Sequence, residues 1–169
     1  GSIGQVGKSV NGGMNWAQIP VPAANHTYLA LDFLTGNIGY VGGGGAGLQA
    51  NIYKTTDGGT SWITQGLGYS GSVLSIKMFD FSFGYALGNL FHKTTNGGTN
   101  WVAQTTPSGA LSNMFVLNKD VIVLGGAVSI SSNNPVIYRT TNGGINWTNI
   151  TGDLPDSIVV GRTEWLNIN

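Results

Sequence analysis

Short apolar runs alternate with clusters of Gly, Asn, Ser and Thr along the whole chain. In three places the same features recur in the same order: an apolar run, a polar turn, and a second apolar run that ends in glycine. These three stretches are 29–43, 76–88 and 114–126. Short apolar runs bounded by turn residues are typical of β-strands. The pattern therefore predicts an all-β chain of many short strands joined by tight turns.

A stricter repeat, a hairpin motif, occurs four times without gaps, at 8–16, 54–62, 93–101 and 139–147. Each copy begins with Lys or Arg, has Asn-Gly-Gly or Asp-Gly-Gly at its centre and ends with Trp. Asn-Gly or Asp-Gly between strand-like flanks indicates a hairpin, because both residues tolerate the positive φ of a tight turn. The Trp supplies a large apolar surface that can pack over the turn.

The spacing of the hairpins predicts the architecture. The tryptophans recur every 39 to 46 residues, and one four-stranded propeller blade takes roughly 40–50 residues. We therefore predict a β-propeller of four-stranded antiparallel blades, with strands A to D in chain order, as a single domain or part of one. Complete blades are expected at 25–65, 71–104 and 109–150, and partial blades at 3–19 and 158–169. Either the partial blades combine to close a four-bladed ring, or the chain is a slice of a longer propeller.

Composition and charge narrow the possible partners. Of the 169 residues only 8% are charged, and seven basic side chains balance seven acidic ones. The chain has no cluster of Lys and Arg residues that could bind the phosphates of a nucleic acid, so no nucleic-acid partner is predicted. The longest apolar run, 121–128, is too short to span a bilayer, so no membrane insertion is predicted. The chain has no cysteine and no His/Asp/Glu group at metal-site spacing, so we expect neither a metal nor another cofactor.

Within the hairpin copies, the pattern Ser/Thr-x-Asp/Asn-x-Gly-x-x-Trp resembles the Asp-box, also called the bacterial neuraminidase repeat. The matching residues are Ser9, Asn11, Gly13, Trp16, Thr55, Asp57, Gly59, Trp62, Thr94, Asn96, Gly98, Trp101, Thr140, Asn142, Gly144 and Trp147. The whole chain is similar to the propellers of photosystem II stability/assembly factor-like proteins, and more distantly to sortilin-type and xyloglucanase propellers. The resemblance implies that the box is a structural element on the rim, away from the ligand face. It also implies a secreted or cell-surface bacterial protein.

Three of the four boxes depart from the family pattern, because Asn replaces the Asp and only Asp57 keeps the carboxylate. Asn can still accept the hydrogen bonds of the turn, so the fold prediction is unchanged.

Sialidases are the best-known enzymes with Asp-boxes, and their chemistry needs three arginines and a Tyr/Glu pair. This chain has only Arg139 and Arg162, and its one glutamate is Glu164. Arg139 also stands where the other motif copies have Lys, which indicates a structural role. Sialidase activity is therefore not predicted.

A glycosidase would need two carboxylates that face each other across a cleft. Asp32, Asp80 and Asp120 recur between strands A and B, so we expect them to cap turns. Asp153 and Asp156 share one loop, where caps are favoured over a catalytic pair. The sequence therefore assigns no catalytic residue.

Propeller ligands usually bind at the face formed by the loops between blades and between strands B and C, and long loops often carry function. Tyr69 is the strongest candidate there, because an aromatic face beside amides suits a sugar or a peptide. The alternative for each candidate is an ordinary solvated loop residue. The candidate ligand-binding residues are Tyr69, His26, Gln49, Asn51, Asn133, Asn134 and Asp153.

These observations favour a non-enzymatic β-propeller module of a secreted or cell-surface bacterial protein, with a protein or a glycan as its ligand. One alternative is a structural subunit of an extracellular assembly, such as a surface layer or fibre, because open blade edges can pair with a neighbour. Such edges would allow self-association. Another alternative is a fragment of a glycoside hydrolase.

Overall fold

The computed structural model describes residues 4–132 and 134–152, and within these ranges the chain forms strands and turns but no helix. The strands group into three four-stranded antiparallel sheets and one two-stranded hairpin. The described ranges therefore also hold no helix long and apolar enough to cross a membrane. The predicted all-β architecture of four-stranded blades is confirmed.

Each four-stranded sheet, or blade, is built from four strands that follow one another in the chain. The N-terminal hairpin consists of β1 (Val6–Lys8) and β2 (Ala17–Ile19). The first blade consists of β3 (Thr27–Phe33), β4 (Gly39–Gly44), β5 (Gln49–Thr55) and β6 (Ile63–Ser70). The second blade consists of β7 (Ser75–Met78), β8 (Gly84–Leu87), β9 (Phe91–Thr94) and β10 (Val102–Ala103). The third blade consists of β11 (Ala110–Val116), β12 (Ile122–Ala127), β13 (Pro135–Thr140) and β14 (Thr148–Asn149).

The hydrophobic core lies between neighbouring blades. Tyr40 and Ile52 of the first blade meet Met78 of the second in one buried cluster. Tyr85 of the second blade and Leu124 of the third belong to another. Burying one large apolar side chain contributes about 1.5–3 kcal/mol. Much of the stability therefore comes from contacts that no blade makes by itself, as in other repeat proteins.

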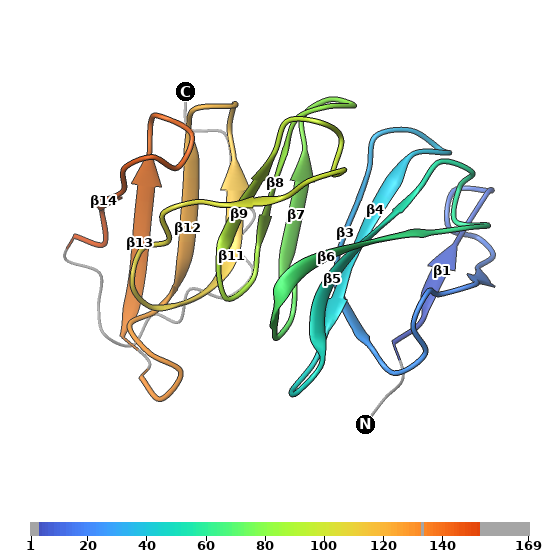
Figure 1. Cartoon of the computed structure of the whole chain (residues 1–169), viewed down its shortest axis with the longest axis horizontal. Coiled ribbons are helices and arrows are strands. Elements are labelled where there is room, and N and C mark those ends of the chain that lie inside the picture. The colour runs from blue at the N-terminus through green and yellow to red at the C-terminus, as the bar shows by residue number, and fades with distance from the viewer. Residues whose placement is uncertain (1–3, 133, 153–169) are drawn as a thin grey trace.

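The blades stand side by side in chain order (Figure 1). The N-terminal hairpin, in blue, lies at one end of this row, and the third blade, in orange, lies at the other. The described residues therefore form an open row of blades, not a closed ring.

Candidate functional site

Each box is a self-contained hydrogen-bonded turn. In the first blade, Thr55 Oγ1 accepts the N–H of Gly59 at 2.8 Å and donates to Asp57 Oδ1 at 2.8 Å. Asp57 Oδ1 also accepts the N–H of Ser61 at 2.9 Å. The other three boxes repeat these bonds with Asn in place of Asp57. Only one side-chain oxygen is required, which explains why Asn serves as well as Asp.

Asp57 makes one contact that the Asn residues cannot make in the same way. Its Oδ2 accepts the hydroxyl of Ser61 at 2.6 Å. The hydroxyl and the N–H of Ser61, followed by Thr55, lower the pKa of Asp57 to about 2. The carboxylate is therefore held in its ionised form as part of the turn.

The Lys that begins the motif joins the hairpin to the first blade and the first blade to the second. Lys8 Nζ donates to the carbonyl of Gly58 at 3.0 Å, and Lys54 Nζ donates to the carbonyl of Gly97 at 2.8 Å. In both cases the acceptor is the first glycine of the following box. The rim around the boxes is therefore a structural joint, here called the blade junction.

Tyrosines at equivalent places in β4 and β8 reinforce the junctions. The Tyr40 hydroxyl donates to the carbonyl of Gly97 at 3.0 Å. The Tyr85 hydroxyl donates to the carbonyl of Lys119 in the third blade at 2.7 Å. Burial, and then the negative charge of Asp120, raise the pKa of Tyr85 to about 12, so it remains a donor throughout the physiological pH range.

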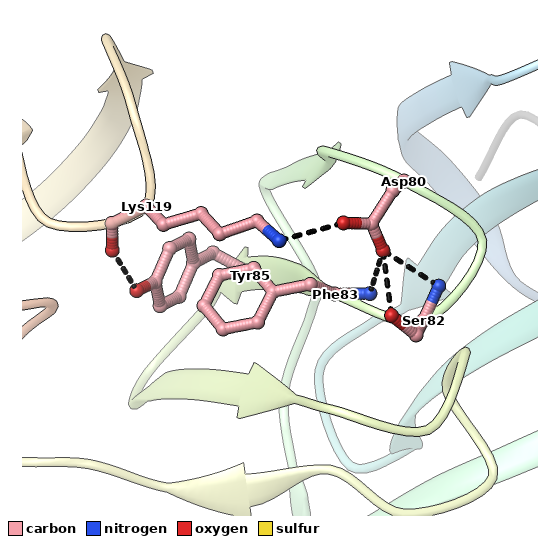
Figure 2. A network of polar contacts seen from close by, with 5 residues as sticks. All are labelled: Asp80, Ser82, Phe83, Tyr85 and Lys119. Atoms are coloured by element: carbon pink, nitrogen blue, oxygen red, sulfur yellow. Dashed lines mark hydrogen bonds and ion pairs between the residues drawn. The ribbon is translucent and has the colours of Figure 1, made fainter.

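Figure 2 shows the turn between β7 and β8, which Asp80 caps as predicted. Its Oδ1 accepts the N–H groups of Ser82 and Phe83, each at 2.8 Å, and its Oδ2 pairs with Lys119 Nζ at 2.7 Å. The ion pair with Lys119 and the turn bonds hold the pKa of Asp80 well below its usual range. Both partners of the ion pair are about half exposed, so the pair contributes little to the stability of the fold. It does connect the second blade to the third.

The prediction that Asp32 and Asp120 cap the equivalent turns is wrong. Asp32 lies within β3, and its carboxylate crosses to the second blade, where it accepts the N–H of Met78 at 2.6 Å and pairs with Lys77 Nζ at 3.1 Å. The turn of the first blade is capped by Thr35, and that of the third by Asn118. A cap must stand two or three residues before the N–H groups that it accepts, and Asp32 stands too early in the chain.

The described residues form a groove of about 900 Å³. It runs along the A strands β3, β7 and β11 and reaches the start of β1. The lining residues lie at 5–7, 28–31, 41, 74–76, 112–115, 123 and 125. None of these residues is charged or is a histidine, so the groove is neutral, and its exposed lining combines apolar side chains with a larger share of polar atoms.

The groove is built from equivalent positions of the repeat. Leu29, Leu74 and Ser112 stand at the same place before the A–B turn of their blades, and all three line the groove. In β3 and β11 the pairing register shifts at this place, between Tyr28 and Ala30 and between Leu111 and Asn113. Such bulges redirect a side chain and often lie beside functional sites. Here they turn Leu29 and Ser112 toward the groove.

Of the predicted ligand-binding residues, Gln49 and Asn51 lie in β5 and not in a loop, since β5 begins at Gln49. Asn51 Nδ2 donates to the Tyr53 hydroxyl at 3.4 Å. Asn134 is exposed beside the loop before β13. Asn133 and Asp153 lie outside the described residues.

Tyr69 and His26 have packing roles in the structure. Tyr69 was predicted to lie in a loop, but β6 continues as far as Ser70, so Tyr69 lies in a strand. Its ring stacks on buried His92, with centroids 5.5 Å apart, and its hydroxyl is buried without a well-formed hydrogen bond. His26 is only 6% exposed, and its Nδ1 lies 2.8 Å from the Tyr53 hydroxyl.

None of the predicted ligand-binding residues that the structure describes lines the groove, and sequence reasoning missed those that do. One signal was available: Leu29 and Leu31 are apolar on the face of β3 opposite buried Ala30, yet 41% and 56% exposed. A strand that is apolar on both faces indicates a second contact surface. Within the described ranges no cluster of three His, Asp or Glu residues could hold a metal ion.

The chain matches the model of a known protein family. Residues 8–159 match the model described as "Photosynthesis system II assembly factor YCF48", a family of this repeat. A search of curated protein sequences found no significant match.

Solved structures support the same fold. The chain superimposes on "YCF48 bound to D1 peptide" with a TM-score of 0.64 and 23% identity, covering 88% of this chain and 46% of that one. "YCF48 from Cyanidioschyzon merolae" superimposes with a TM-score of 0.60 and 20% identity, covering 79% of this chain and 42% of that one. A GH74 enzyme of Niastella koreensis superimposes with a TM-score of 0.65 and 21% identity, covering 85% of this chain and 26% of that one. The chain thus spans less than half the length of each of these proteins.

Proposed function

Because the chain belongs to the photosystem II assembly factor YCF48 family, we propose that it is a non-enzymatic propeller module that binds a segment of a protein partner in the A-strand groove. The groove carries this proposal. It has no charged lining residue, and Leu29 and Leu31 stay exposed within it. A neutral groove that offers both polar atoms and exposed leucines suits an extended, uncharged peptide, whose backbone can form hydrogen bonds while its apolar side chains contact the leucines. The similar structure named for a bound D1 peptide supports a peptide ligand.

Glycoside hydrolysis is not expected in this groove. Two facing carboxylates are required for glycoside hydrolysis, and none lies among the described residues that line the groove. The likeness to a GH74 enzyme keeps a hydrolase fragment as the alternative, with Asp153 and Asp156 outside the described residues. Sugar release that disappears in Asp153→Asn or Asp156→Asn would favour that alternative.

A charge placed in the groove tests the proposal. We expect Leu31→Lys to weaken peptide binding at least about tenfold, which corresponds to about 1.4 kcal/mol, because a lysine there must be desolvated by an apolar ligand. Leu117→Lys is the matched control, since both leucines are 56% exposed and Leu117 lies outside the groove. The probes are the D1 peptide and a phage-displayed library of short linear peptides, measured by fluorescence anisotropy.

Equal weakening by the two variants would contradict the assignment of the groove. If the chain binds no peptide but binds glycans on an array, and Leu31→Lys abolishes that binding, the ligand is a glycan.

The location outside the cell or on a bacterial cell surface remains a proposal that rests on the sequence resemblance. Fractionation of the native host, with an antibody against this chain, checks it. Recovery in the cytosolic fraction would contradict it.

A further inference from the structure

A second hollow lies at the junction between the first and second blades. Its volume is about 560 Å³, within the range of roughly 300–1,000 Å³ that small-ligand sites occupy. Both blades have all four of their strands, so the hollow does not arise at an end of the row. It shares no lining residue with the A-strand groove. We call it the junction pocket, and its lining residues are Lys54, Thr56, Ile63, Thr64, Gln65, Gly66, Thr99, Asn100 and Trp101.

The box Trp of the second blade makes a different contact from those of the first and third blades. Trp62 Nε1 and Trp147 Nε1 each donate at 2.9 Å to a backbone carbonyl of the preceding unit. Trp101 Nε1 donates instead to Gln65 Oε1 at 3.1 Å. Ile63 stands two residues before Gln65 in β6, on the same face of the strand, and is 63% exposed. The pocket therefore offers an aromatic and an aliphatic side chain beside an amide.

Lys54 brings a positive charge to the junction pocket. Its Nζ donates to the carbonyl of Gly97 at 2.8 Å, which uses one of the three donors of an ammonium group. Among the described residues the ion pairs are made by Lys77 and Lys119, so Lys54 has no carboxylate partner there. No acidic residue lines the pocket either. An anion that enters the pocket can therefore form a charge-assisted hydrogen bond with Lys54.

Short polar side chains make up most of the remaining lining. Three threonines, one glutamine and one asparagine supply hydroxyl and amide groups. Thr56, Thr99 and Asn100 are exposed, so they can exchange water for the polar groups of a ligand. Such groups both donate and accept hydrogen bonds, as the hydroxyls of a sugar do. Together with the apolar side chains they favour a sugar as the ligand.

We propose that the junction pocket binds a sugar that carries a carboxylate, such as a hexuronic acid. The carboxylate binds at Lys54 Nζ, the ring packs on Trp101 and Ile63, and the ring hydroxyls exchange hydrogen bonds with Gln65 and Asn100. The charge of Lys54 selects an acidic sugar over a neutral one. The hydroxyls and amides select a sugar over an acidic peptide. This site is independent of the proposed function of the groove.

Nuclear magnetic resonance of the ¹⁵N-labelled 169-residue chain tests the site, because the indole N–H of Trp101 gives a signal of its own. The Trp101→Phe variant identifies that signal. The probes are glucuronate, glucose and acetate, of which the last two each supply one part of the first. We expect glucuronate to shift the Trp101 signal with a dissociation constant at least about fivefold below that of glucose, because only glucuronate pairs with Lys54. Acetate should shift it least.

Thr99→Asp and Thr60→Asp are a matched pair of variants. The two threonines are exposed, and each donates its hydroxyl to the carbonyl of its own box Asn96 or Asp57, at 3.0 and 3.2 Å. Thr99 lines the junction pocket and Thr60 does not. A carboxylate at position 99 competes with the ligand for Lys54 and repels it. We therefore expect Thr99→Asp to weaken glucuronate binding at least about fivefold and Thr60→Asp to leave it unchanged.

Several outcomes would overturn the proposal. Glucuronate and glucose that bind equally would show that Lys54 selects no charge. Equal weakening by Thr99→Asp and Thr60→Asp, or a loss of glucuronate binding in Leu31→Lys, would place the sugar elsewhere. A short glutamate-containing peptide that shifts the Trp101 signal at lower concentration than glucuronate would make the ligand an acidic peptide. The dispersion of the backbone amide signals shows in the same spectra that each variant is folded.

Discussion

At the residue scale, the box depends on a hydroxyl and one side-chain oxygen. Thr55, Thr94 and Thr140 are about 1% exposed, and each accepts the N–H of the second box glycine. A buried N–H that loses its acceptor costs about 1–3 kcal/mol. The hydroxyl is thus required, whereas the charge of Asp57 is an addition that the other boxes lack.

The pKa of Asp57 gives a prediction for acid stability. Because the folded pKa is about 2 and the unfolded value is about 3.9, the stabilisation is complete above about pH 4 and is lost as the pH falls through about 2. We expect the free energy of unfolding to fall less between these pH values in Asp57→Asn than in the unaltered chain. Urea unfolding at a series of pH values measures this difference.

Ser61→Ala provides the control for this titration. It removes the largest cause of the low pKa and leaves the carboxylate in place. The pKa of Asp57 should therefore rise, and the loss of stability should begin at a higher pH. Identical acid profiles for Asp57→Asn and the unaltered chain would show that Asp57 makes no such contribution.

At the scale of the elements, the blade junction can be separated from the turn that it covers. Gly144 and Gly13 occupy the same place in their boxes, and both have a φ of 90°. A Cβ at Gly144 would lie 2.5 Å from Phe91, whereas one at Gly13 would have Trp16 as its neighbour at 3.8 Å. The backbone strain of an alanine is therefore matched, and only the packing differs.

We expect Gly144→Ala to destabilise the chain more than Gly13→Ala by about 1–3 kcal/mol, the usual cost of overpacking. Urea unfolding measures both variants. Equal losses would mean that strain in the turn, and not the fit between blades, accounts for the burial of these glycines.

At the scale of the whole molecule, stability should be uneven along the row of blades. The second blade is packed on both sides, and Tyr85, Leu87 and Phe91 are fully buried. Among the described residues, the N-terminal hairpin packs against one blade, and its strands are short. In a repeat protein each unit gains most of its stability from its neighbours, so local opening is easiest at an unpaired end.

Hydrogen exchange should show this gradient, with the slowest amides in β8 and β9 and the fastest in β1 and β2. Equal protection in all blades and in the hairpin would contradict this gradient.

The hairpins, their spacing and the blade architecture could all be predicted from the sequence. The reason is that a box is closed by bonds between residues at most four positions apart, such as those of Thr55, Asp57 and Ser61. Turn chemistry of this kind is local and is therefore visible in a sequence. The cap by Asp80 was predictable for the same reason.

The contacts between residues of different blades could not be predicted from the sequence. Asp32 reaches Met78 over 46 positions of the chain, Tyr69 stacks on His92 inside the molecule, and β6 continues through an expected loop. The groove likewise joins equivalent residues of separate blades, turned inward by bulges that leave no mark in the residue pattern. Such contacts depend on the angle between packed sheets, which is set by how whole side chains fit together and not by local turn chemistry.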